Sequence, residues 1–282
     1  MADSYVSLLI NSPFAKNPLG LLSLFFLFLA RFLPIIQTSP FFGARVLANP
    51  VKVAFAITIF CIFLPQLIAK TTTPLEFNPI LLLYMVKEMA IGLFIGHLMG
   101  LPFVIAQSAG IIIDNQRGGA SLMVNDPTIQ NQSSPLGTLF NMVLIYIFFV
   151  IGGPWDFLNA ISLSFDLMPV DKFIGADFFS MQGVAAEQFI KMLNQVMIMT
   201  TQLATPALLA ILMTDSFLGI ANRLAPQVQI TFLGMPLKSL LGLTIVCLGW
   251  RLLVAQMAIQ SKFWLNRIVE LVYVFDAASK TN

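Results

Sequence analysis

The chain has 282 residues, of which 58% are hydrophobic and 10% are charged, and its formal net charge is +2. A soluble domain carries about 25% charged residues, so this composition excludes an ordinary water-soluble protein and indicates a protein of the membrane. The small net charge also gives no basis for nucleic-acid binding.

Six long apolar segments follow one another along the chain. Each approaches the roughly 20 residues that a helix needs to span the hydrocarbon of a bilayer, and no run of useful length alternates like a strand. The connections between them are rich in Pro, Gly, Asn and Ser. The sequence therefore predicts an all-α integral membrane protein with about six long, partly broken apolar helices. They cover approximately Leu19–Ile36, Val51–Ala69, Pro79–Ile105, Leu136–Ile151, Val184–Met213 and Leu237–Ile259.

We expect these segments to form three parts in chain order. Residues 1–183 would be an N-terminal helical part, residues 184–260 a C-terminal helical hairpin, and residues 261–282 a tail. The tail mixes basic and acidic residues with aromatic and aliphatic ones. This pattern is typical of an amphipathic helix that lies at an interface or against a partner.

The third segment carries three glycines and two adjacent charges. Gly92, Gly96 and Gly100 recur every four residues, and small residues at this spacing favour the close approach of another helix backbone. Lys87 and Glu88 precede them. Charges at such depth face a protein partner, a cavity or an ion path, so we expect these two residues to contact other subunits.

Beyond the third segment, the stretch from Gly110 to Pro127 is glycine-rich and charged. Irregular backbone at membrane depth must be buried in protein or line an aqueous path. Asp114 and Arg117 are one helical turn apart, so they can pair if the stretch begins as a helix. The composition suits a gate, a plug or a binding site, and equally a solvent-exposed connector. The candidate residues are Asp114, Gln116, Arg117, Gly118, Gly119, Ala120, Ser121, Leu122, Met123, Val124, Asn125, Asp126 and Pro127.

The fifth segment carries a polar stripe. Its polar side chains fall within about 80° of one another on a helix, which suits a hydrogen-bonding seam between helices better than the lining of a transport path. Either interpretation requires protein on that face. The stripe consists of Glu187, Lys191, Asn194, Thr201 and Thr205.

The last segment carries two further charges. Arg251 lies inside the segment, and Lys238 follows Pro236, near the start of a helix, where a positive charge is poorly placed for the helix dipole. Both should therefore have partners outside their own helix. We expect Glu187, Lys191, Lys238 and Arg251 to contact other subunits.

The sequence contains no nucleophile elbow, phosphate-binding loop, dinucleotide fingerprint or paired-histidine zinc motif. His97 is the single histidine, and without a neighbouring cysteine or carboxylate it is a poor ligand for a metal or haem. We therefore expect no enzyme activity and no cofactor. A proton- or solute-coupled secondary transporter, with Lys87, Glu88 and Glu187 as a relay, is the alternative, because broken helices and buried charges are typical of that class.

Short motifs in a fixed order resemble the FliR/SctT family, the export-gate components of flagellar and virulence type III secretion systems. The match runs from about Ala30 to Ile259. It includes Ala30-Arg-Phe-Leu-Pro34, Ile113-Asp-Asn-Gln-Arg-Gly118, Asp126-Pro127 and Met235-Pro-Leu-Lys-Ser239. The second and fourth of these look more like the injectisome branch than the flagellar one.

The resemblance implies a subunit of a helical export gate in the bacterial inner membrane, partly raised out of the bilayer. It implies one copy of this chain beside several copies of each of two small helical membrane proteins. The switch/autoprotease export component and the unfolded secreted proteins would be further partners. In the family, the loop that matches Gly118–Pro127 projects into the central pore and helps to close it, so we expect Asp114–Pro127 to form the pore-closing loop.

Overall fold

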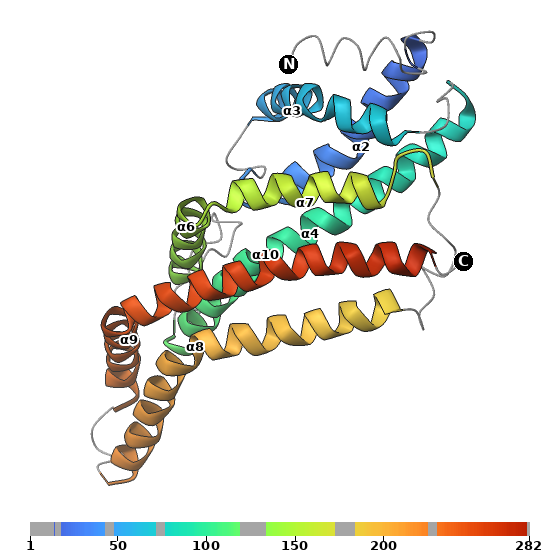
Figure 1. Cartoon of the computed structure of the whole chain (residues 1–282). Helices are drawn as coiled ribbons and strands as arrows, with labels where there is room; N and C mark the ends of the chain where they lie inside the picture. Colours follow the sequence, from blue (N-terminus) through green and yellow to red (C-terminus); the bar gives the residue numbers. More distant parts are fainter. Residues whose placement is uncertain are drawn as a thin grey trace. The chain divides into compact units, whose positions relative to one another are not determined.

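The computed structural model describes residues 14, 18–42, 48–71, 77–118, 134–172, 184–224 and 230–280. Its ordered elements in these ranges are helices (Figure 1), which confirms the predicted all-α class. The helices are α2 (Pro18–Thr38), α3 (Asn49–Lys70), α4 (Pro79–Gln116), α6 (Pro135–Val150), α7 (Gly153–Leu167), α8 (Val184–Leu224), α9 (Ile230–Leu248) and α10 (Trp250–Lys280).

Each predicted apolar segment contains a helix, but the third is longer than predicted and the last is broken. α4 continues to Gln116, so the stretch from Gly110 that we expected to be irregular begins as helix, because Ile111–Ile113 extend its apolar run. α4 ends at Gln116, and Gly118, two residues later, has a φ of +93°, a conformation with which glycine commonly terminates helices. The last predicted segment is interrupted at Gly249, where α9 and α10 meet at 65°.

α7 is an element that the sequence analysis did not predict. Its polar residues interrupt its apolar run, so it did not register as an apolar segment. Its buried face is nevertheless continuous, because Phe157, Ile161 and Phe165 recur every four residues and are at most 1% exposed.

Spatial contacts divide the chain into two compact units, which are not simple halves of the sequence. The first unit comprises Met1–Gly100, Gly153–Ile190 and Trp264–Asn282, and the second comprises Leu101–Gly152 and Lys191–Phe263. α4, α8 and α10 therefore contribute residues to both. The three consecutive parts expected from the sequence stay a prediction.

Aromatic rings form the core of the first unit. Phe28 on α2 stacks on Phe32 of the same helix and on Phe165 of α7, with ring centroids 5.1 and 5.4 Å apart. Phe60 and Phe63 of α3 complete the cluster at 5.5 and 6.1 Å from the Phe28 ring. Aromatic side chains bury large areas and favour such offset and tilted pairs, so these rings hold α2, α3 and α7 together.

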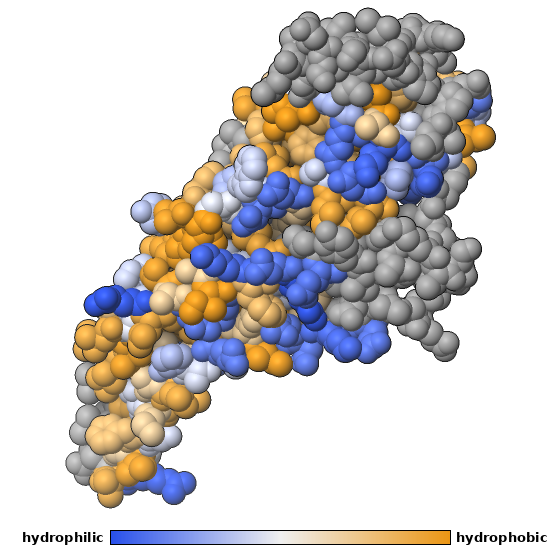
Figure 2. Space-filling model, in the orientation of Figure 1, coloured by the Kyte–Doolittle hydropathy of each residue, from blue (hydrophilic) through white to orange (hydrophobic). Residues whose placement is uncertain are grey.

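Four helices of the described chain are long and apolar enough to cross a membrane, namely α2, α3, α4 and α8. The number rises to six if the pairs α6–α7 and α9–α10, each separated by a short break, count as one span each. On the face drawn in Figure 2, hydrophobic side chains cover much of α9 and the C-terminal half of α8. Met213 and Leu248, for example, are 76% and 79% exposed. Apolar surface of this kind is typical of contact with lipid or with a protein partner.

Candidate functional site

The buried carboxylate of Asp114 joins the end of α4 to the start of α6. Its Oδ1 accepts a hydrogen bond from Arg117 Nε at 2.7 Å, so the pair expected from their spacing is present. Its Oδ2 accepts from Leu136 N at 2.9 Å and from the Ser134 hydroxyl. Ser134 Oγ in turn accepts from Gly137 N and caps α6. Asp114 thus fastens both ends of the segment between α4 and α6.

A pair of glycines allows this contact. A β-carbon placed on Gly110 would lie 2.5 Å from both the Cα and the N of Gly137, closer than such atoms can approach. The backbones of α4 and α6 therefore meet here without side chains between them. Because Gly110 is one helical turn before Asp114, the crossing brings the first turn of α6 within reach of the carboxylate. From the sequence we expected Gly110 to lie in a loop, so this crossing was not predicted.

Arg117 extends the network to α9. Its Nη1 donates to Ser239 Oγ at 3.2 Å, and a β-carbon on Gly118 would lie 3.9 Å from Met235 Cγ. The two sequence motifs Ile113–Gly118 and Met235–Ser239 are therefore neighbours in the second unit. Lys238, on the same turn of α9, forms an ion pair with Asp215 of α8. α4, α8 and α9 are thus connected at the base of the segment that follows α4.

The structure places only part of the expected pore-closing loop. Asp114 is fully buried, Gln116 is exposed, and Arg117 and Gly118 are half-buried. The remaining candidates, Gly119–Pro127, lie outside the described residues. The described part is therefore the base of the loop.

Lys87 and Glu88 have partners within the first unit. Glu88 is fully buried and receives Arg31 Nε on one oxygen, while Lys87 Nζ lies 2.7 Å from the other. Arg31 was not among the candidate residues, although a charge in the middle of an apolar segment is itself a signal that a partner exists. The three side chains form one ion cluster between α2 and α4.

Two of the three helix-packing glycines of α4 face α2. A β-carbon on Gly92 would overlap the carbonyl oxygen of Arg31, and one on Gly96 would lie 2.8 Å from the Cα of Ile35. Gly100 has more room, because its nearest neighbour, the Thr38 carbonyl oxygen, would be 3.8 Å away. The close approach indicated by the glycine spacing therefore takes place within this chain, at Gly92 and Gly96.

The remaining candidate charges lie at the surface of the described chain. Glu187 and Lys191 of α8 are exposed, and so is Arg251 in the first turn of α10. Lower in the polar stripe, the hydroxyls of Thr201 and Thr205 donate to the carbonyls of Met197 and Thr201 in their own helix, at 2.9 and 2.7 Å. The threonine hydroxyls of the stripe therefore have acceptors within their own helix, and the presence of protein on that face stays a prediction.

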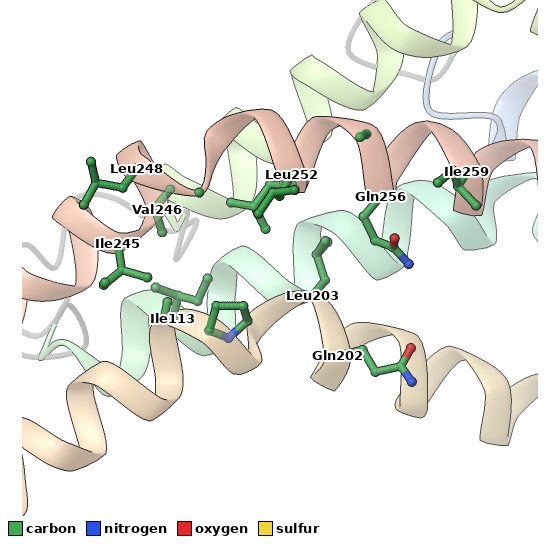
Figure 3. A pocket seen from close by; sticks show the side chains of 14 residues that line it. Ile113, Gln202, Leu203, Ile245, Val246, Leu248, Leu252, Gln256 and Ile259 are labelled. Carbon is green, nitrogen blue, oxygen red and sulfur yellow. The ribbon is translucent and has the colours of Figure 1, made fainter.

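The second unit also contains an apolar pocket of about 630 Å³ (Figure 3). α4 contributes Ile113, α8 contributes Leu203, and Val246 and Leu252 come from the two sides of the break at Gly249. Its polar side chains are two glutamines, Gln202 on α8 and Gln256 on α10. Such a lining suits an apolar occupant, and the sequence analysis did not predict it because its residues come from four helices.

These features define a multi-pass helical membrane protein whose buried charges at Arg31, Glu88 and Asp114 are paired inside the fold. The family described as "Bacterial export proteins, family 1" matches residues 22–262. The chain therefore belongs to this family, the FliR/SctT family of bacterial export proteins, which confirms the resemblance seen in the sequence.

Relatives from both branches of the family are similar to this chain. The Yop proteins translocation protein T of Yersinia pestis is 36% identical over 171 residues, which cover 60% of this chain and 64% of that protein. The secretion system apparatus protein SsaT of Salmonella typhimurium is 30% identical over 76% of this chain and 80% of its own length. The flagellar biosynthetic protein FliR of Pectobacterium carotovorum is 28% identical over 78% of this chain and 82% of its own length. The higher identity to the Yersinia protein fits the injectisome branch. The match to the Yersinia protein covers less than two thirds of the length of that protein.

Proposed function

We propose that this protein is an inner-membrane subunit of the export gate of a type III secretion system, of the injectisome branch. The family match across residues 22–262, over a chain of four to six apolar helices, carries this proposal. The subunit forms part of the channel through which unfolded proteins leave the cell. It acts by opening and closing a passage, without catalysis and without a cofactor.

Within this function, Asp114–Pro127 is the pore-closing loop. The resemblance motivates this role, and the geometry of the loop base supports it. A closure that lets unfolded chains pass must move, and glycines at Gly118 and Gly119 allow such movement at a cost in conformational entropy. Its ends must nevertheless stay in place. Asp114 supplies that attachment, since its carboxylate binds Arg117 on one side of the loop and Ser134 and Leu136 on the other.

Arg117 gives the loop base a connection to the C-terminal helices. Its guanidinium binds both Asp114 on α4 and Ser239 on α9. A displacement of α9 would therefore pull on the same side chain that holds the loop. In this proposal, the hairpin of α8 and α9 senses the neighbouring subunits and Arg117 transmits their position to the loop.

The proposed partners are two small helical membrane proteins in several copies each, the switch/autoprotease component, and the exported proteins. One copy of this chain completes the gate, part of which lies above the bilayer. The exposed charges of the C-terminal helices, at Glu187, Lys191 and Arg251, would face polar groups of the small partners. Apolar side chains of α8 and α9 such as Met213 and Leu248 would cover the rest of the contact.

The structure favours this function over a coupled transporter. A relay through Lys87 and Glu88 requires groups that exchange protons or solute with a water path. Here both oxygens of Glu88 contact cations of the same unit, and the side chain is fully buried. Such a pair has the environment of a structural ion cluster.

Deleting Gly118–Asn125 tests the closing role. We expect the variant to assemble with its partners and to leak ions or a small dye across the inner membrane, whereas Gln116→Ala, at an exposed position beside the loop, should stay tight. An assembled deletion variant that is as tight as the natural protein would contradict the role. Purifying the tagged chain from its native host tests the wider function, which fails if no small helical membrane proteins accompany it.

A further inference from the structure

Arg31 uses its guanidinium to bind the end of α7. Its Nη1 donates to the carbonyl oxygen of Ser164 at 2.8 Å, and its Nη2 donates to that of Met168 at 2.7 Å. The guanidinium carbon lies 4.2 Å from the centroid of the Phe165 ring, a favourable cation–π distance. The remaining donor, Nε, binds Glu88. Arg31 of α2 thus binds the last turn of α7 and the residue that follows it.

Lys87 binds the residues that follow. Its ammonium donates to the carbonyl oxygens of Pro169, Val170 and Lys172, at 3.1, 3.2 and 2.8 Å. The side chain is 8% exposed. Since an ammonium has three donors and no acceptor, these three carbonyls account for its hydrogen-bonding capacity. Glu88, whose Oε1 lies 2.7 Å from Nζ, pairs with it as an ion.

The acceptors have a common chemistry. Ser164 lies in the last turn of α7, where carbonyls carry partial negative charge, and the other acceptors are carbonyls of the residues after the helix end at Leu167. Glu88 is the counter-ion that both cations share. The hydrogen-bond acceptors are main-chain atoms, and the buried carboxylate of Asp171 in the same segment adds an electrostatic attraction to Lys87.

We infer that Arg31 and Lys87 are positioning residues that clasp Met168–Lys172 by its carbonyls, with Glu88 orienting both. The clasp fixes the path of the chain as it leaves α7, before any partner protein binds. It also removes Lys87 and Glu88 from the set of residues available to other subunits, because both are enclosed within the first unit. The inference does not depend on the proposed gate function.

The first test measures local exposure in the purified full-length chain. With Cys61 and Cys247 replaced by alanine, a single cysteine is introduced at Val170, which is 2% exposed, or at Ala160 in the middle of α7, which is 3% exposed. Lys87→Met should raise the rate of maleimide labelling at Val170→Cys by about tenfold or more, as expected for lost hydrogen bonds to a charged group. Labelling at Ala160→Cys should stay unchanged.

Lys87→Arg should keep the Val170→Cys thiol protected, because it retains the charge and the donors. The inference is overturned if Lys87→Met leaves Val170→Cys protected. It is also overturned if labelling at Ala160→Cys rises in parallel, since the cluster would then support the stability of the whole unit and not the position of this segment.

A second test separates a carbonyl clasp from a simple ion pair. Exchanging the charges in Arg31→Glu/Glu88→Arg preserves an ion pair but removes the donors that reach Ser164 and Met168. The clasp predicts that Val170→Cys is labelled faster in the exchanged variant than in the chain with Arg31 and Glu88 in place. Equal protection in the two chains would overturn it. Lys70→Met is the matched control, because it removes the exposed pair with Asp166 of α7, at 3.3 Å, and should leave labelling unchanged.

Discussion

Gly92 of α4 faces the carbonyl oxygen of Arg31 on α2 so closely that a β-carbon at this glycine would overlap it. Glu88, one helical turn earlier on α4, receives the side chain of the same arginine. The arrangement recurs further along α4, where Gly110 meets the backbone of Gly137 and Asp114, one turn later, receives the start of α6. In both places a glycine lets a second helix approach, and an acidic side chain one turn away binds a group of that helix.

The first prediction concerns Gly92. Gly92→Ala should lower the stability of the subunit by about 1–3 kcal/mol, because the added methyl group forces α2 away from α4. The matched control is Gly100→Ala on the same helix, where the added carbon makes only ordinary contacts and better helix propensity favours alanine. Thermal unfolding of the detergent-purified chain measures both. Equal melting temperatures for the two variants would show that α2 and α4 can separate at Gly92 without loss of stability.

The second prediction concerns the crossing of α4 and α6. Gly110→Ala should separate the two helices, loosen the attachment of Ser134 and Leu136 to Asp114, and make the assembled gate leaky. Gly219→Ala serves as the control, because a β-carbon there meets nothing within 4 Å. Dye entry into cells that produce each variant is the measurement. A tight gate with Gly110→Ala would mean that this crossing does not position the loop.

Asp114 itself supports a third prediction. Asp114→Asn keeps the size of the side chain but turns charge-assisted hydrogen bonds into weaker ones, at a cost of about 1–3 kcal/mol. We expect a lower melting temperature and leakage similar to that of the loop deletion. Gln116→Ala, two residues away and exposed, should change neither. The role assigned to the carboxylate fails if Asp114→Asn matches the natural protein in both measurements.

The fourth prediction concerns Lys238 and Asp215. Lys238→Glu places two like charges together on α8 and α9, and because both side chains are partly exposed the effect on stability should be about 0.2–1 kcal/mol. Adding Asp215→Lys should restore stability and secretion. A double variant that recovers stability without secretion would show that Lys238 also binds a carboxylate of a partner subunit.

Apolar runs predicted the helices well, and the four-residue glycine spacing pointed to a true close approach at Gly92 and Gly96. The pairing of Asp114 with Arg117 also followed from spacing alone, because both belong to one helical turn. What these successes share is locality. A helix period connects residues three or four apart, so the sequence displays such relationships directly.

The missed features depend on residues that are distant in sequence. The carbonyl acceptors of Arg31 and Lys87 leave no side-chain signature in Met168–Lys172. α7 escaped notice because its polar face diluted its apolar one. Lys238 was expected to need a partner from another protein, whereas Asp215 of the same chain occupies that position, and only the pairing of α8 with α9 reveals it.

Threonine hydroxyls in the apolar helices donate hydrogen bonds to the backbone of their own helix. Those of Thr58, Thr201, Thr214 and Thr244 each donate to the carbonyl four residues earlier, at 2.7–3.0 Å. A helix satisfied in this way can enter lipid alone. The ion cluster, in contrast, needs both α2 and α4, and its hydrogen bonds to carbonyls need α7 and the residues after it as well. Assembly of the subunit therefore has a natural order, in which the ion pairs between α2 and α4 form before α7 is added to them.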